Sequence, residues 1–241
     1  MLLRRITEHV KAQNWTAVGL DFFIVVVGVF IGIQVSNWND ARADRALERE
    51  YIERLYADMN GSLEDYEDND NWDQRRIETQ AVILKALHEG TLAQEDLNDF
   101  AEGLTYLGRH NPIRRRWGTV EELKSTGNIA ILQDVALRTK IAAIDADYDR
   151  ANRIISESAA QVTGLRTIAM QNFAPIEFDF ETGSAVLVAY DFEAMVTDRN
   201  FANIVANIQL QSTVIVGFTE RHMQTIASLR DDLSKILEIE R

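Results

Sequence analysis

The longest apolar stretch of the chain lies near its start, in residues 16 to 35. Within it only Asp21 is charged, and Gln34 is the one other strongly polar residue. About twenty residues in a helix rise roughly 30 Å, which is the thickness of the hydrocarbon core of a bilayer. The pattern therefore predicts a transmembrane helix, which we place at residues 15 to 38. A buried helix of a soluble domain and a signal peptide cleaved at Ala41-Arg42-Ala43 are the alternatives.

After this span, apolar residues recur every three or four positions in three long stretches, which is the spacing of helices with one buried face. The first stretch continues from the span to Glu89-Gly90, with a bend expected at Asn60-Gly61. Its predicted buried face consists of Leu47, Tyr51, Leu55, Met59, Leu63, Tyr66, Ile77, Ala81, Leu84 and His88. In the second stretch, from about residue 134 to 172, the predicted buried residues are Leu137, Ile141, Ile144, Tyr148, Ala151, Ile155, Val162, Leu165 and Ile168. In the third, from about residue 200 to 239, they are Ile204, Ile208, Gln211, Ile215, Phe218, His222, Ile226, Leu229, Leu233, Ile236 and Ile239.

Shorter elements connect these stretches. The pattern predicts a helix over residues 94–107, a loop over 108–118, a short helix over 119–124 and a small β-hairpin around 176–190. With only two prolines and 12 glycines, the chain encodes few other turns. The predicted fold class is all-α, with the transmembrane helix continuing into an elongated antiparallel helical bundle at residues 39–241.

Small and polar residues of the predicted span share one side of the helix. Asp21, Val25, Gly28, Gly32 and Ser36 fall within about 60° of one line, while bulky residues cover the rest. Two glycines four positions apart allow a second backbone to approach closely, and a carboxylate in a span is costly unless it is paired or protonated. This stripe predicts helix packing with another copy or another membrane protein. The alternative is that Asp21 reaches the interface and the glycines are incidental.

Aromatic and basic residues flank the span. The expected membrane anchors are Trp15, Trp38, Arg4, Arg5 and Lys11. Tryptophans are enriched at membrane interfaces, and basic residues favour the cytoplasmic side. Leu2, Leu3, Ile6 and Val10 would share one helical face, so residues 1–14 are predicted to form an amphipathic helix on the cytoplasmic surface. This orientation places residues 39–241 on the other side, which is the periplasm if the membrane is a bacterial inner membrane.

Composition narrows the classes of function. The net charge of −13 disfavours binding to nucleic acid phosphates. The absence of cysteine excludes disulfides, thiol catalysis and thiolate metal sites. The four histidines stand apart, and no glycine pattern that cradles nucleotide phosphates occurs. We therefore predict no catalytic residues, no metal, no cofactor and no enzymatic activity.

Two charged segments remain as candidates. The acidic run at residues 64–73 invites a calcium site, but it lacks the loop glycine and closing glutamate of an EF-hand, so a solvated helix face is preferred. The basic cluster comprises Arg114, Arg115, Arg116 and Trp117. It could contact an anionic ligand or a partner's carboxylates, or it could pair with the acidic helices of its own chain.

Two segments carry a resemblance to a known family. The exit of the span holds a Gln-x-x-Asn-Trp-Asn signature, formed by Gln34, Asn37, Trp38 and Asn39. Residues 121–141 match through Leu123, Ser125, Gly127, Asn128, Leu137 and Arg138. The chain thus resembles an uncharacterised family of bacterial single-pass membrane proteins, a domain of unknown function. The resemblance implies the topology of one span followed by a helical domain, and it supplies no catalytic residues.

The expected function follows from these features. A span with a packing stripe and a helical bundle without catalytic groups predicts a scaffold or accessory subunit of a membrane complex. Its expected partners are the lipid bilayer and either itself or another membrane protein, with no nucleic acid. The rival hypothesis is a periplasmic sensor that binds a small ligand in its bundle. Only about fifteen residues would lie in the cytoplasm, which counts against self-contained signalling.

Overall fold

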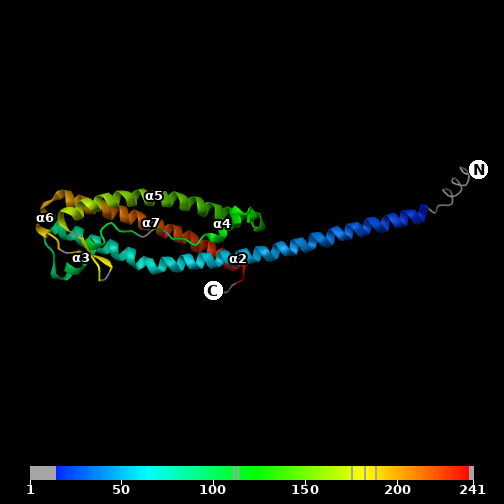
Figure 1. Cartoon of the computed structure of the whole chain (residues 1–241), viewed down its shortest axis with the longest axis horizontal. Helices are drawn as coiled ribbons and strands as arrows, with labels where there is room; N and C mark the ends of the chain where they lie inside the picture. Colours follow the sequence, from blue (N-terminus) through cyan, green and yellow to red (C-terminus); the bar gives the residue numbers. More distant parts are fainter. Residues whose placement is uncertain are drawn as a thin grey trace, which may run out of the picture. The chain divides into compact units, whose positions relative to one another are not determined.

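The computed structural model describes most of the chain, and its cartoon is drawn in Figure 1. The described residues are 15–110, 112, 114–174, 176–181, 183–187 and 189–238. The predicted cytoplasmic helix at residues 1–14, with Arg4, Arg5 and Lys11, lies outside them. The chain divides into two compact units, Met1–Glu50 and Tyr51–Arg241.

In the first unit the described residues, from Trp15 onward, form one helix. It is the beginning of α2 (Trp15–Glu89), which covers the whole predicted span. Apolar side chains between Leu20 and Val35 are mostly 46% to 70% exposed, and none is buried. By length and composition this segment is able to cross a membrane.

The second unit is an elongated bundle of three long helices, as predicted. They are the remainder of α2, from Tyr51 to Glu89, with α5 (Val135–Phe173) and α7 (Arg199–Ile236). Figure 1 shows the three lying side by side, with α7 antiparallel to α2 and to α5. α2 and α5 run in the same direction, because the loop between α3 and α4 returns along the bundle instead of forming a short link. The α7 helix is also long and apolar enough to cross a membrane, but its packing against α5 makes it a core helix.

Short elements close the ends of the bundle. They are η1 (Gln94–Asp96), α3 (Leu97–Thr105), α4 (Gly118–Ser125), η2 (Asn128–Ile131), β1 (Ile176–Asp179), β2 (Ser184–Leu187) and α6 (Phe192–Thr197). The strands form the predicted antiparallel hairpin, with Ile176 opposite Leu187. Gly183 has a φ of 66° in its turn, a conformation that favours glycine. The sequence pattern did not predict α6.

The boundaries of the long helices follow from local chemistry. Asp134 caps α5, because its carboxylate accepts hydrogen bonds from the backbone N–H groups of Ala136 and Leu137. Asp198 caps α7 in the same way. Gly90 follows the end of α2 with a φ of 68°, where a left-handed residue stops the helix.

The core confirms most of the predicted buried residues. Those that are buried include Tyr51, Leu55, Met59, Leu137, Ile141, Ile144, Ala151, Ile155, Val162, Ile204, Ile208, Ile215, His222, Ile226, Leu229 and Leu233. They lie on one face of each helix and meet in the middle of the bundle. Burial of such apolar surface is the main force that holds the helices together.

The predicted buried face of α2 is wrong near its end. Ala81 and His88 are exposed, and Ile77 and Leu84 are only half-buried. The residues buried instead are Asp73, Arg76, Thr79, Gln80, Ile83, Ala86 and Leu87. The buried face is thus rotated toward a set that includes four polar residues, which a pattern of apolar positions cannot reveal.

Two further expectations of burial need correction. Ile168 is 49% exposed, since Ala169 and Met170 take its place inside, and Ile236 is 42% exposed at the end of α7. Ile239 lies outside the described residues. Gly61 does not interrupt α2, which is helical through this position. Instead, a Cβ at Gly61 would collide with the Arg116 guanidinium, so the glycine makes room for that side chain.

Candidate functional site

The residues of the predicted packing stripe that the structure describes are exposed on α2. Val25, Gly28, Gly32 and Ser36 are exposed. A Cβ added at Gly28 or Gly32 would meet no atom within 4 Å, so no part of the described chain covers the two glycines. Trp38 is exposed as well, while the side chains of Asp21 and Trp15 lie outside the described set.

The basic cluster is divided between two helices. Arg115 Nη2 lies 2.8 Å from Asp145 Oδ1 of α5, and the Arg115 side chain is almost fully buried. Its guanidinium lies over two aromatic rings, 3.5 Å from the centroid of Tyr148 and 4.4 Å from that of Trp117. A planar guanidinium suits this combination of an ion pair and ring stacking. Arg115 and Trp117 therefore join the loop to α5.

Asp145 receives a second cation at the same place. Lys124 Nζ lies 2.5 Å from its Oδ2, at the end of α4. Burial alone would raise the pKa of Asp145, but the hydrogen bonds from Lys124 and Arg115 hold it below its ordinary value. The carboxylate therefore stays ionised and fixes α4 and the preceding loop against α5.

Arg116 turns to the opposite side and pairs with Asp65 of α2, at 2.9 Å. Both side chains are half-exposed, so this pair contributes little to stability. Arg114 is exposed. Of the two predicted alternatives for the cluster, pairing with the chain's own acidic helices therefore describes Arg115 and Arg116.

His222 of α7 lies next to this cluster. It is 4% exposed, and its ring centroid is 5.2 Å from that of Tyr148. Burial and the nearby charge of Arg115 lower the pKa of His222 to about 4, despite the opposing charge of Asp147. The imidazole is therefore neutral near pH 7. Its Nε2 atom is buried and has no hydrogen-bond partner in the part of the chain that the structure describes.

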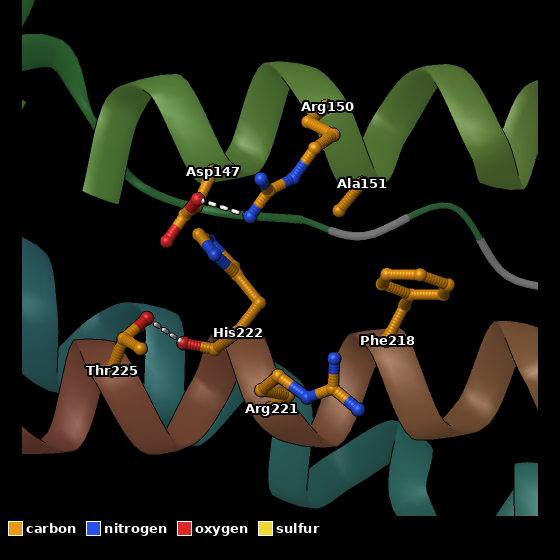
Figure 2. Close-up of a pocket in the computed structure, with 7 residues that line it drawn as sticks. All are labelled: Asp147, Arg150, Ala151, Phe218, Arg221, His222 and Thr225. Atoms are coloured by element: carbon orange, nitrogen blue, oxygen red, sulfur yellow. Dashed lines mark hydrogen bonds and ion pairs between the residues drawn. The ribbon is translucent and has the colours of Figure 1, made fainter. Parts of the chain in front are cut away.

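A pocket opens beside His222, between α5 and α7. It has a volume of about 70 Å³ and is lined by Asp147, Arg150, Ala151, Phe218, Arg221, His222 and Thr225. Figure 2 shows the His222 imidazole projecting from α7 toward Asp147 and Arg150 of α5. Arg150 Nη2 donates to Asp147 Oδ1 at 2.5 Å, and Thr225 Oγ1 donates to the carbonyl oxygen of His222 at 2.6 Å. The pocket lining combines polar side chains with the phenyl ring of Phe218. We call this pocket the His222 pocket.

A second buried polar group lies on α2. Arg76 Nη2 and Asp73 Oδ1 are 2.7 Å apart, with both side chains almost completely buried. The Arg76 guanidinium also lies over the Trp72 ring, at 5.1 Å from its centroid. Asp73 ends the acidic run at 64–73, so the predicted solvated face is wrong at this residue. The physical reason is that Arg76, one helical turn later, neutralises the carboxylate within the bundle.

His110 belongs to the same surroundings. Burial and the charge of Arg76 lower the pKa of His110. Its Nδ1, the amide of Gln80 and the Nε and Nη1 atoms of Arg76 have no hydrogen-bond partner among the described residues. Polar atoms of this kind are normally satisfied by ordered water when they are buried.

Among the residues that the structure describes, no metal-binding site is evident. No group of three or more His, Asp or Glu side chains there has a metal-binding arrangement. Part of the acidic run, the side chains of residues 68–71, lies outside the described set.

Sequence reasoning placed Tyr148 and His222 on buried faces but did not bring them together. It also did not pair Arg115 with Asp145, which lies 30 positions later in the chain. The sequence held one indication of this cluster. Tyr148 and His222 both lie on predicted apolar faces, where a buried polar group needs a hydrogen-bond partner.

Comparisons with protein-family models, with curated proteins and with solved structures give no match to this chain. The family membership suggested by the Gln-x-x-Asn-Trp-Asn signature therefore stays a prediction.

Proposed function

We propose that this chain is a single-pass protein of a bacterial inner membrane that acts through contacts with other proteins. It would serve as a scaffold or accessory subunit and associate with a second copy through the stripe on its span. The observation that carries the proposal is the apolar helical surface between Leu20 and Val35, which the described chain leaves uncovered. A surface of this kind is stable only in lipid or against other helices.

The bundle supports the same role. It is held by internal ion pairs and an apolar core, and a net charge of −13 gives the chain a strongly acidic character. The alternative, a periplasmic ligand-binding domain, has one specific observation in its favour, which is the His222 pocket. The two roles are compatible, because a pocket between α5 and α7 leaves the stripe free.

The proposed orientation predicts which sites are accessible from the periplasm. The chain has no cysteine, so each introduced cysteine is the only one. Glu181→Cys, in the exposed hairpin turn, should react with a membrane-impermeant maleimide once the outer membrane is opened, whereas Thr7→Cys should react only after the inner membrane is lysed. The measurement is gel-shift labelling of whole cells, and the reverse pattern would refute the orientation.

Enlarging the stripe should weaken assembly. Gly28→Ile or Gly32→Ile would hold two helices apart, at a cost of about 1–2 kcal/mol each for a close-packed span interface. The expected result is a smaller complex in mild detergent, seen by size-exclusion chromatography with light scattering, and fewer proteins recovered with the chain from native membranes.

Gly19→Ile provides the matched control for this experiment. Gly19 lies nine positions before Gly28, which at 100° per residue places it on the opposite side of the helix. It receives the same side chain, so effects on insertion or helix propensity are shared. An equal loss of assembly in all three variants, or in none, would show that the stripe does not hold a partner.

A further inference from the structure

We propose that the His222 pocket binds a small organic carboxylate. The pocket lies within the bundle unit, between the first half of α5 and the second half of α7, and it is separate from the stripe. This inference does not depend on the membrane role, because its test measures ligand binding and not assembly.

The pocket has a buried floor and a charged mouth. His222 and Ala151 are buried, while Asp147, Arg150 and Arg221 are exposed. Phe218 and Thr225 are half-buried between them. A ligand that enters past the charged side chains would therefore reach a surface formed by an imidazole, a methyl group and an aromatic ring.

Charge at the mouth favours an anion. Two arginines and one aspartate line the mouth, and the carboxylate of Asp147 already pairs with Arg150. The Arg221 guanidinium lies 5.5 Å from the Phe218 ring centroid and has no ion-pair partner in the described residues. An unpaired arginine beside a pocket is notable on an acidic chain. Arginine can hold a carboxylate through two parallel hydrogen bonds.

The floor contains a polar atom whose hydrogen-bonding capacity the described protein leaves unused. His222 lines the pocket, and its buried Nε2 lacks a hydrogen-bond partner among the described residues. A neutral imidazole that carries its proton on Nε2 would donate to a carboxylate oxygen. A buried polar atom without a partner is costly, and a ligand oxygen would remove that cost.

Size and apolar lining define the rest of the ligand. A water molecule needs about 10–15 Å³ of such space, so 70 Å³ accommodates about five to seven non-hydrogen atoms. Phe218 and Ala151 would contact a short hydrocarbon chain. Butyrate, a four-carbon carboxylate, is a probe of the appropriate size and charge.

The test uses the full-length chain in lipid nanodiscs and isothermal titration calorimetry with sodium butyrate. Saturable binding at millimolar butyrate is expected, and butylammonium chloride of the same length and opposite charge should not bind. Arg221→Gln and His222→Leu should each weaken binding by at least about tenfold, since the first removes the positive charge and the second removes the hydrogen-bond donor.

Arg153→Gln is the matched control. Arg153 is an exposed arginine of α5 that does not line the pocket, so its loss lowers the net charge equally and should leave butyrate affinity unchanged. Arg221 is exposed, so its replacement should not disturb folding. The absence of saturable butyrate binding, equal binding of butylammonium, or equal weakening by Arg221→Gln and Arg153→Gln would each overturn the proposal.

Discussion

Arg76→Met is expected to lower the free energy of unfolding of the bundle by about 3–5 kcal/mol. The substitution removes the guanidinium that lies 2.7 Å from the Asp73 carboxylate in a nearly solvent-free place. The carboxylate would lose this charge partner and would remain buried. The measurement is urea unfolding of the detergent-solubilised chain, followed by far-ultraviolet circular dichroism.

The neighbouring Arg75 is the control for this experiment. It pairs with Asp99 and Glu102 of α3, but all three side chains are more than one third exposed. Surface pairs contribute about 0–1 kcal/mol, so Arg75→Met should have a small effect. The double variant Asp73→Leu/Arg76→Met should recover much of the loss, because no charge is then left buried. Equal losses for Arg75→Met and Arg76→Met would contradict the importance of burial.

The long helices were predictable because their cores repeat apolar residues with helical spacing. Ile141, Ile144 and Ile155 of α5, like Ile226 and Leu229 of α7, needed no knowledge of their partners. The hairpin was predictable for a similar reason. Apolar and polar residues alternate on both sides of Gly183, which adopts a left-handed conformation in the turn. These features depend on neighbours within a few positions.

The second half of α2 shows where such reasoning fails. Its buried face includes Thr79 and Gln80, whereas the apolar pattern pointed to Ala81 and His88. Close packing decides the outcome here, since the backbone of Thr79 lies against Gly103 of α3. A Cβ at Gly103 would come within 2.7 Å of the Thr79 carbonyl oxygen, so the contact requires glycine. The spacing of apolar residues along α2 does not reveal this contact with α3.

The two buried polar groups were unpredictable for a related reason. Asp73 was part of an acidic run that resembles a solvated surface, and only the fold places it inside the bundle. Arg115 is buried together with its ion-pair partner Asp145 and the rings of Tyr148 and Trp117, which contact its guanidinium. Each requires long-range pairing, which a single sequence does not encode in its periodicity. A charged residue can therefore be assigned to the surface or to the core only after its counter-charge is found.

His222 should make the stability of the bundle depend on pH between about 6.5 and 4. In the folded chain its pKa is about 4, whereas an exposed histidine has a pKa near 6.5. As the pH falls through this window, the unfolded chain takes up a proton that the folded chain does not, so the folded state loses stability. The loss attributable to His222 is about 3 kcal/mol when the pH reaches 4.

Comparison with His222→Gln isolates this contribution. Glutamine does not titrate, so the difference in unfolding free energy between wild type and variant should shrink or change sign as the pH falls from 7 to 4. His110, whose pKa is also lowered, is present in both chains and cancels. Asp145 and Asp232, whose pKa values lie below their ordinary range, stay ionised through the window. A difference that stays constant across the window would show that His222 is not held neutral by burial and by Arg115, and would place its imidazole in contact with solvent.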